Sequence, residues 1–488
     1  MGALTFRRTL DVRILLAAVG LEGLALIMYA TGHVRLTLAL AVGPILVAAV
    51  GLLLAADGVI FVCAALALEL TLPRLNNPLP FAGGTKIYPA DLVVGLALGA
   101  WALGRLRDLR DPKGPHAAVR RLHWSPALGL PLVLFAAAVG SATIRGHTRY
   151  GEPLVGAPVR MILYAAIAAA VFRAYPKKLY RGVVIVFYVG TVWQFFNAIY
   201  YAATGGSQSI AEDLSTGGTR LLSVSVSLYL AGTFFLALIN LSQGGTTRAK
   251  VLHAAMLLLS GAEIVVAYSR GTFLTVTVLS MILVFFLRDV RIGAVSMIPV
   301  AVPLLLLAAL VLAQTHSTVI PTFVNRLNPA VAQDPSVQWR GSANHALWEQ
   351  VRDSPLVGVG FGKNLEFIVN DIPFETTQDA HNDFLYLLAA SGVFGLGSFL
   401  LVVGSAMRNA VRRYRESNDR EERALIIFAI VTALSFLLNG LVEPLVTLPT
   451  ILLTIWTLLL LPASVPRRRV AVEARPEVPP AYAGAATR

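Results

Sequence analysis

A histidine lies where a long polar segment runs into an apolar stretch of the chain. His381 stands in the run Ala380-His381-Asn382-Asp383-Phe384-Leu385-Tyr386, and the residues after it are apolar enough for a membrane helix. At the start of such a helix the dipole favours the neutral imidazole, which can accept a proton from a substrate. We therefore predict that His381 is a general base at the water-facing end of a membrane helix. Asn382 and Asp383 could orient the imidazole or the acceptor, or could cap the helix.

Arginines beside the apolar runs could bind an anion. Arg270 lies in a very short polar turn between two apolar runs, Arg220 directly precedes an apolar run, and Arg340 lies in the long polar segment. A guanidinium binds phosphate oxygens through two parallel hydrogen bonds and stays charged at physiological pH. We predict that Arg220, Arg340 and Arg270 together form an anion site, although each alone could form a salt bridge or contact lipid headgroups. The candidate acidic partners are Glu152, Glu212, Asp213, Asp334, Glu349, Asp353, Glu366, Asp371, Glu375, Asp379, Asp383 and Glu443.

The composition excludes a soluble globular protein. Of the 488 residues, 56% are hydrophobic and 14% are charged, the mean hydropathy is +0.70, and the apolar residues form blocks of roughly 17 to 22 residues. Continuous blocks favour helices, because a membrane barrel would show short segments of alternating polarity. We predict an all-α polytopic membrane protein with about 12–14 transmembrane helices. The predicted spans are 13–31, 36–54, 58–72, 88–104, 126–144, 157–172, 181–202, 221–241, 250–268, 271–287, 293–314, 382–404, 424–441 and 445–462.

Basic residues between the spans set the predicted orientation. The net charge of +13 comes mainly from Lys and Arg in short connecting segments, where the positive-inside rule accounts for them, so nucleic-acid binding is not expected. An N-terminus inside the cell makes five basic segments cytoplasmic: 105–121, 173–181, 288–291, 408–423 and 467–469. His381 then lies outside. Arg7 and Arg8 before the first apolar run are typical of a signal sequence, but no cleavage site follows, and we expect an uncleaved first helix.

We predict three parts along the chain. N-terminal transmembrane helices occupy 1–249, a second membrane domain with a large external loop at 315–380 occupies 250–462, and a disordered cytoplasmic tail occupies 463–488. The loop should be ordered, because it is rich in aromatic residues and has helical amphipathic spacing from Asn344 to Val351. Its glycine run, Gly358-Val359-Gly360-Phe361-Gly362-Lys363, lacks the residues of a nucleotide-binding loop, since Val357 and Asn364 replace the required glycine and hydroxyl. We expect this run to hold the loop against the membrane helices.

Several of these residues resemble the O-antigen ligase and polymerase superfamily. The resemblance covers about 250 to 460 and is only topological before that. It rests on Ser269-Arg270-Gly271, Trp339-Arg340, Trp348, Asp353-Ser354-Pro355-Leu356-Val357-Gly358-Val359-Gly360, and Ala380-His381-Asn382 with Leu385, Gly392 and Gly395.

The resemblance implies a GT-C-like glycosyltransferase of the cytoplasmic membrane with its active site on the external face. It implies an inverting, metal-independent transfer or polymerisation of a polyprenyl-diphosphate-linked saccharide, with no cofactor, onto a glycan, lipid or cell-wall acceptor. His381 would be the catalytic base. Arg220, and either Arg340 or Arg270, would grip the diphosphate. The choice among polysaccharide polymerase, ligase and protein glycosylation stays open.

A secondary transporter is the alternative from another class, because about a dozen spans suit one. Transporters concentrate polar groups at the middle of the membrane, on broken helices of repeated halves. In this chain the arginines of the predicted anion site instead lie at the outer ends of the spans and in the external loop. The transporter hypothesis rests on polar residues within or beside the spans: Glu22, Asp57, Glu69, Gln194 and Glu263.

Overall fold

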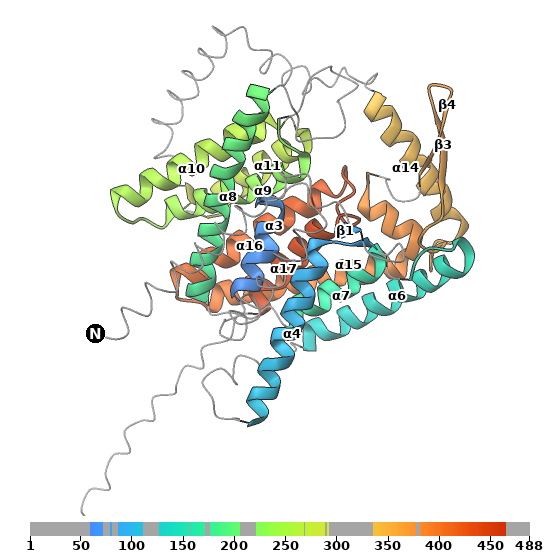
Figure 1. Ribbon diagram of the computed structural model, residues 1–488, viewed down its shortest axis with the longest axis horizontal. Coiled ribbons are helices and arrows are strands. Elements are labelled where there is room, and N and C mark those ends of the chain that lie inside the picture. The colour runs from blue at the N-terminus through green and yellow to red at the C-terminus, as the bar shows by residue number, and fades with distance from the viewer. Residues whose placement is uncertain are drawn as a thin grey trace, which may run out of the picture.

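The computed structural model describes residues 59–71, 79–80, 86–110, 126–154, 156–170, 176–204, 221–267, 269–287, 290–291, 335–376 and 381–464. Figure 1 shows these residues as a bundle of helices with a small lobe beside it, formed by one helix and a strand pair. The helices of the bundle are α3 (Val59–Thr71), α4 (Pro89–Arg110), α6 (Pro126–Tyr150), α7 (Ala157–Ala170), α8 (Pro176–Thr204), α9 (Val224–Ser242), α10 (Thr247–Val266), α11 (Arg270–Phe286), α15 (Asp383–Glu416), α16 (Arg420–Asn439) and α17 (Pro449–Ser464). A short antiparallel pair, β1 (Leu79–Pro80) and β2 (Lys86–Ile87), precedes α4.

The helices confirm an all-α polytopic membrane protein. Every predicted span within the described residues coincides with one of the bundle helices. Within those residues, five helices are long and apolar enough to cross a membrane: Leu128–Tyr150, Lys177–Thr204, Val224–Ser242, Thr247–Val266 and Asp383–Glu416. Further apolar helices of 10–17 residues accompany them. The predicted spans 13–31, 36–54 and 293–314 and the predicted tail lie outside the described residues, so the total number of spans stays a prediction.

Aromatic side chains and buried hydroxyls join the helices of the bundle. Phe135 of α6, Phe399 of α15 and Trp456 of α17 form one cluster, with ring centroids 5.6–5.8 Å apart. The hydroxyls of Tyr229 and Thr454 lie 2.7 Å apart between α9 and α17. Where water is absent, such hydrogen bonds between helices satisfy polar groups that burial would otherwise leave unpaired.

Ion pairs at one end of the bundle join two of the segments predicted to be cytoplasmic. Lys177 lies 3.6 Å from Asp419, and Arg181 lies 4.0 Å from Glu421. These contacts join 173–181 to 408–423, so the two basic segments lie at the same end of the bundle. The positive-inside rule requires this if both segments are cytoplasmic. The start of α15, where His381 lies, is at the opposite end.

Helix α15 is broken near its start. Gly392 has a φ of 72°, so the helical hydrogen bonds are interrupted there. The segment 355–360 fills the break: the backbone N–H groups of Val359 and Gly360 donate to the carbonyls of Ala389 and Ala390, each over 2.9 Å. On the other side of the break, the N–H of Val393 donates to the carbonyl of Pro355 over 2.9 Å.

The break admits the segment only because two glycines meet there. A Cβ on Gly392 would lie 2.2 Å from the carbonyl oxygen of Leu356, and one on Gly358 would lie 2.3 Å from the backbone of Ala390. Gly358 also has a positive φ, of 75°. The glycine run therefore has the role expected from the sequence, which is to hold the loop against a membrane helix.

Residues 335–376 of the predicted external loop form the lobe beside the bundle. Helix α14 (Pro335–Asp353) packs against an antiparallel hairpin of β3 (Leu365–Val369) and β4 (Ile372–Thr376). Leu347 of α14 and Leu365 and Phe367 of β3 belong to its small hydrophobic core. The predicted order of the loop is confirmed for these residues, and 315–334 and 377–380 lie outside the described part of the chain.

Candidate functional site

One carboxylate contacts both the predicted base and a predicted anion-binding arginine. Glu443 Oε2 lies 3.5 Å from Nδ1 of His381. Its other oxygen, Oε1, accepts a hydrogen bond of 3.3 Å from Nη2 of Arg340. The side chains of His381, Glu443 and Arg340 are 24%, 20% and 34% exposed, so the three polar groups lie partly in water and partly in protein. In this setting opposite charges interact more strongly than in bulk water.

The backbone of His381 holds the imidazole in an unusual position. His381 has a φ of 49°, in the left-handed region that few residues other than glycine occupy. Such a conformation costs on the order of 1–3 kcal/mol and persists where the surroundings enforce it. The ring also meets Trp339 edge to face, with centroids 5.0 Å apart and planes at 89°. Trp339 on α14 and Glu443 therefore both fix the direction of the imidazole.

Asn382 and Asp383 connect the start of α15 to its surroundings. Asn382 is the N-cap, because its side-chain oxygen accepts a 3.0 Å hydrogen bond from the N–H of Leu385. Asp383 is buried, and its carboxylate accepts hydrogen bonds from the N–H groups of Leu445 and Val446. Capping, one of the two roles considered for Asn382, is thus observed. Asp383 binds the turn after α16 through its carboxylate.

That turn carries Glu443. It joins α16 to α17, and the N–H of Glu443 donates to the carbonyl of Asn439 over 2.9 Å. The N–H of Asp383 donates to the carbonyl of Gly440 over 2.7 Å. Asp383 is therefore hydrogen-bonded to the turn on both sides of Glu443. In this way the first residue of α15 fixes the position of the Glu443 carboxylate, which contacts His381 just before the helix.

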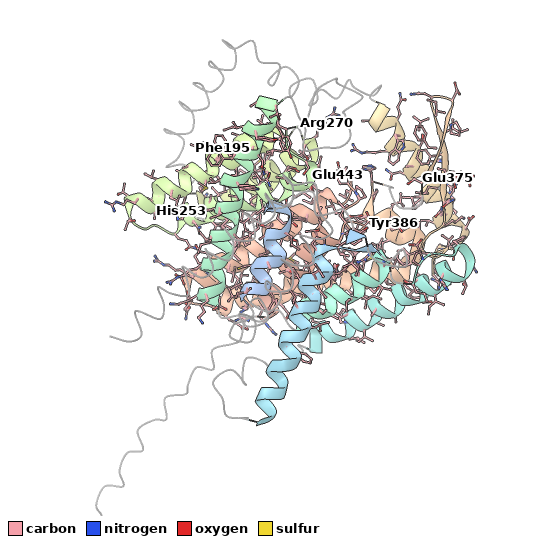
Figure 2. The ribbon with its side chains drawn as sticks, viewed as in Figure 1. Phe195, His253, Arg270, Glu375, Tyr386 and Glu443 are labelled. Atoms are coloured by element: carbon pink, nitrogen blue, oxygen red, sulfur yellow. The ribbon has the colours of Figure 1, made fainter. Side chains whose placement is uncertain are left out.

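Arg270 begins a helix that packs against the same turn. It is the first residue of α11, whose N-cap is Ser269. A Cβ on the next residue, Gly271, would lie 2.6 Å from Oδ1 of Asn439 and 3.2 Å from Val442. Figure 2 shows Arg270 and Glu443 in the same region of the molecule, with Glu375 of the hairpin farther out.

The start of α9 lies beside the start of α11. The hydroxyls of Ser227 and Thr272, in the first turns of the two helices, are 2.7 Å apart. Arg220 lies outside the described residues and precedes Ser223, the N-cap of α9, by three positions. Helix N-termini carry positive partial charge and unpaired N–H groups, so two adjacent starts favour a nearby anion.

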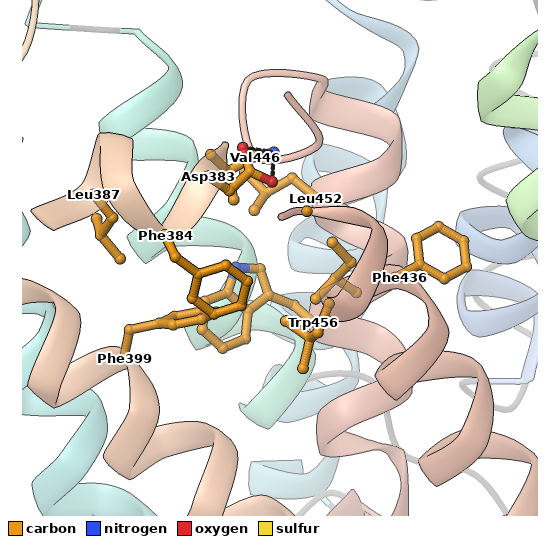
Figure 3. Close-up of a pocket in the computed structure, with 11 residues that line it drawn as sticks. Asp383, Phe384, Leu387, Phe399, Phe436, Val446, Leu452 and Trp456 are labelled. Atoms are coloured by element: carbon orange, nitrogen blue, oxygen red, sulfur yellow. Dashed lines mark hydrogen bonds between the residues drawn. The ribbon is translucent and has the colours of Figure 1, made fainter. Parts of the chain in front are cut away.

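An apolar pocket adjoins the site (Figure 3). It lies between α15, α16 and α17, and Asp383 is its one acidic residue. Its lining residues are Asp383, Phe384, Leu387, Phe399, Phe436, Leu437, Gly440, Val446, Leu452, Ile455 and Trp456. The site therefore has a polar region at Glu443 and an apolar region directly beside it.

Other arginines at this end of the bundle have structural partners. Arg160 donates to Asp91 over 3.0 Å and lies over the ring of Tyr88. Arg145 donates to the carbonyl of Val357, in the segment that fills the break in α15. Arg160 thus forms a salt bridge, and Arg145 helps to hold segment 355–360 in place.

The prediction of a metal-independent site is not tested by these contacts. Within the described ranges, no three His, Cys, Asp or Glu side chains gather as metal ligands would. Metal independence stays a prediction that rests on the resemblance.

The fold and the site together define a helical multi-pass membrane protein with a histidine, a carboxylate and arginines at one end of its bundle. Residues 255–400 match the family model described as O-antigen ligase, and this match supports membership of the O-antigen ligase and polymerase family. The resemblance seen in the sequence is thereby confirmed for these residues. The family implies a glycosyltransferase-like activity on lipid-linked glycans in a membrane. The search of curated proteins found no match for the chain.

Glu443 could not be singled out from the sequence as a residue of this site. It stood among the twelve candidate partners of the outer arginines, and nothing in their spacing ranked it above the others. One signal was present: Glu443 is the only acidic residue between 423 and 488 that lies between two predicted spans. A charge in so short a turn at the membrane boundary needs a partner.

Proposed function

We propose that the protein transfers or polymerises a polyprenyl-diphosphate-linked saccharide at the external face of the cytoplasmic membrane. The observation that carries the proposal is the contact of Glu443 with both His381 and Arg340. Through Glu443, a proton acceptor, His381, lies close to a cation that can bind phosphate, Arg340. These are the two groups that a glycosyl transfer from a diphosphate requires when no metal takes part.

In the proposed reaction, an acceptor hydroxyl attacks the anomeric carbon of the donor sugar. A bond forms between this oxygen and the carbon, and the bond from the carbon to the diphosphate oxygen breaks on the opposite face, which inverts the configuration. His381 accepts the hydroxyl proton. The diphosphate leaves with the electron pair of the broken bond, and guanidinium groups stabilise its new charge.

Glu443 supports both halves of this reaction. When His381 takes the proton, the ring becomes positive, and a carboxylate 3.5 Å away stabilises that charge. When the donor binds, Arg340 can turn from Glu443 to the diphosphate, because a phosphate oxygen is an equally good partner for a guanidinium. Glu443 then serves the histidine alone.

The remaining cations and helix ends support a diphosphate site next to Glu443. Arg270 begins α11, which packs on the turn that carries Glu443. Arg220 precedes α9, whose first turn contacts that of α11. Two arginines, with Arg340 as the third, would thus surround a diphosphate at two helix N-termini.

The transporter hypothesis gains little from the broken helix. A transporter would use the backbone groups freed by such a break to bind its substrate. At Gly392, these groups are instead bonded to the segment 355–360. Glu263 of α10 is buried and its carboxylate has no hydrogen-bond partner among the described residues, and it is the one observation that favours the alternative.

Replacement of the base tests the proposal. We expect His381→Ala to reduce glycan transfer by about 10²- to 10⁴-fold, the usual effect of removing a general base, while the donor still binds. His345→Ala is the matched control, since His345 is exposed on α14, with 74% of its side chain accessible. The assay uses purified protein, a polyprenyl-diphosphate oligosaccharide and chelator. Wild-type turnover by His381→Ala, or turnover that chelator abolishes, would refute the metal-free histidine mechanism.

A further inference from the structure

A row of aromatic rings runs from His381 into the hairpin. The ring of His381 meets Trp339 of α14 at 5.0 Å, and Trp339 meets Phe367 of β3 at 5.4 Å. Phe367 lies 5.9 Å from Phe374 of β4, with the two ring planes only 13° apart. Successive rings are therefore in contact from the proposed base to the outer strand of the hairpin.

The row lies on one face of the hairpin and ends at its surface. The strand register pairs Phe367 with Phe374 and Val369 with Ile372, so these four side chains share a face. Phe367 is buried against α14, whereas Phe374 is 37% exposed and Ile372 is 57% exposed. Trp339 is half-buried. An apolar surface thus leads from solvent toward His381.

The reaction determines what this surface should hold. His381 must take a proton from the acceptor hydroxyl, so the reacting end of the bound acceptor lies at the histidine. The rest of the acceptor then extends along a protein surface that begins there. Arg340 contacts Glu443, and the start of α11 packs on the turn that carries Glu443, so this side of the histidine suits the donor diphosphate. The aromatic row is the surface that begins at the other neighbour of the imidazole, Trp339.

We propose that Trp339 and Phe374, packed on the buried Phe367, form a subsite for the saccharide of the acceptor, an inference that rests on the proposed function. A sugar ring presents a patch of C–H groups that packs on an aromatic face, while its hydroxyls stay hydrated at the ring edge. Aromatic side chains give a large contact area with little loss of side-chain entropy.

Carboxylates on the same hairpin argue against insertion of the hairpin into the lipid bilayer. Glu366 and Glu375 are paired on the face away from the aromatic row, and Asp371 lies at the tip, so a hairpin only two strands wide would carry three carboxylates into the membrane with it. Burial of carboxylates in the hydrocarbon region is costly, and anionic headgroups repel them. A hydrated, uncharged saccharide face meets neither penalty.

Two substitutions on opposite faces of the hairpin test the subsite. The probe is the donor oligosaccharide released from its lipid, and its binding to the full-length protein in nanodiscs is measured directly. We expect Phe374→Ala to weaken this binding about three- to tenfold, as loss of one aromatic contact would. Phe374→Trp should retain binding. Ile368→Ala is the matched control, because Ile368 is 66% exposed on the other face of the hairpin and should change nothing.

Further measurements separate the subsite from the proposed function. Binding of polyprenyl diphosphate without a glycan should be the same in all three variants. Equal oligosaccharide binding by wild type and Phe374→Ala, or no binding by wild type, would overturn the subsite even if transfer occurs. Quenching by brominated lipids of a dye on Phe374→Cys, in a Cys63→Ala background, would place the surface in the bilayer and overturn it as well. A wild-type protein that binds the oligosaccharide but transfers nothing would refute the function and leave the subsite intact.

Discussion

Asp383 binds Val446 across 63 positions of the chain: both carboxylate oxygens accept the Val446 N–H, over 3.1 and 3.2 Å. The N–H of Leu445 is a second donor, at 3.0 Å. Because a buried acceptor would lose free energy if these hydrogen bonds were absent, the contact fixes the turn from Gly440 to Val446. The first turn of α15 therefore sets the position of Glu443, and with it the contacts of His381 and Arg340.

Glu443→Gln should separate base activation from donor binding. The amide keeps the size of the side chain but loses the charge that stabilises protonated His381, so we expect transfer to slow by about ten- to a hundredfold. Donor affinity should stay constant or rise, because Arg340 no longer has a carboxylate competing with the diphosphate. Turnover rate and donor dissociation constant, measured on the same preparation, give both values. A loss confined to donor affinity would contradict the role assigned to Glu443.

Arg340→Lys, unlike Glu443→Gln, should lower the affinity for the donor. Lysine keeps the charge but cannot form two parallel hydrogen bonds, so we expect weaker binding of polyprenyl diphosphate and impaired transfer. Arg352→Lys is the control, because Arg352 is exposed in the last turn of the same helix, α14. The same substitution at Arg220 and Arg270 would rank the three arginines. Full donor binding by all three lysine variants would reduce them to surface charges.

Gly392→Ala should destabilise the protein and impair transfer. The alanine Cβ would approach the Leu356 carbonyl oxygen to 2.2 Å in a left-handed conformation, a strain that costs about 1–3 kcal/mol before any steric adjustment. Gly397→Ala, farther along α15, is the control, because a Cβ there meets nothing within 4 Å. Thermal unfolding in detergent should show a lower midpoint for Gly392→Ala only. Equal midpoints would mean that segment 355–360 contributes nothing to stability.

Labelling can test the predicted orientation. In a Cys63→Ala background, Glu375→Cys on the hairpin should react with an impermeant thiol reagent in intact cells, and so should Arg220→Cys. Arg412→Cys, on the α15 face that carries an ion pair with Glu416, should react only after the cells are opened. Labelling of Arg412→Cys in intact cells would reverse the orientation and place the site inside.

The bundle helices could be predicted from the sequence because each contains a continuous apolar run. The contact of Lys177 with Asp419 also agrees with the positive-inside rule, which groups basic segments at one end without any knowledge of packing. The break at Gly392 could not be predicted in this way. An apolar run looks the same whether a helix is continuous or interrupted, and the partner that fills the break lies in a distant polar loop.

The candidate site was predictable only in part. His381 and Arg340 stand in recognisable positions, at a helix start and in an ordered loop. Glu443 reaches them through a turn between two other helices, and that neighbourhood depends on how α14, α15 and α16 pack. The left-handed backbone of His381 is likewise a product of tertiary structure, because nothing in the sequence around it requires a positive φ.

The backbone bonds between segment 355–360 and α15 have a consequence for engineering. Two short segments, 355–360 of the lobe and the break in α15, are joined by backbone hydrogen bonds and by close packing at Gly358 and Gly392. A chimera that exchanges only the lobe with a homologue would pair mismatched halves. Exchange of the whole unit from Pro335 through Phe394 carries both halves together, and is the smallest graft that we expect to fold.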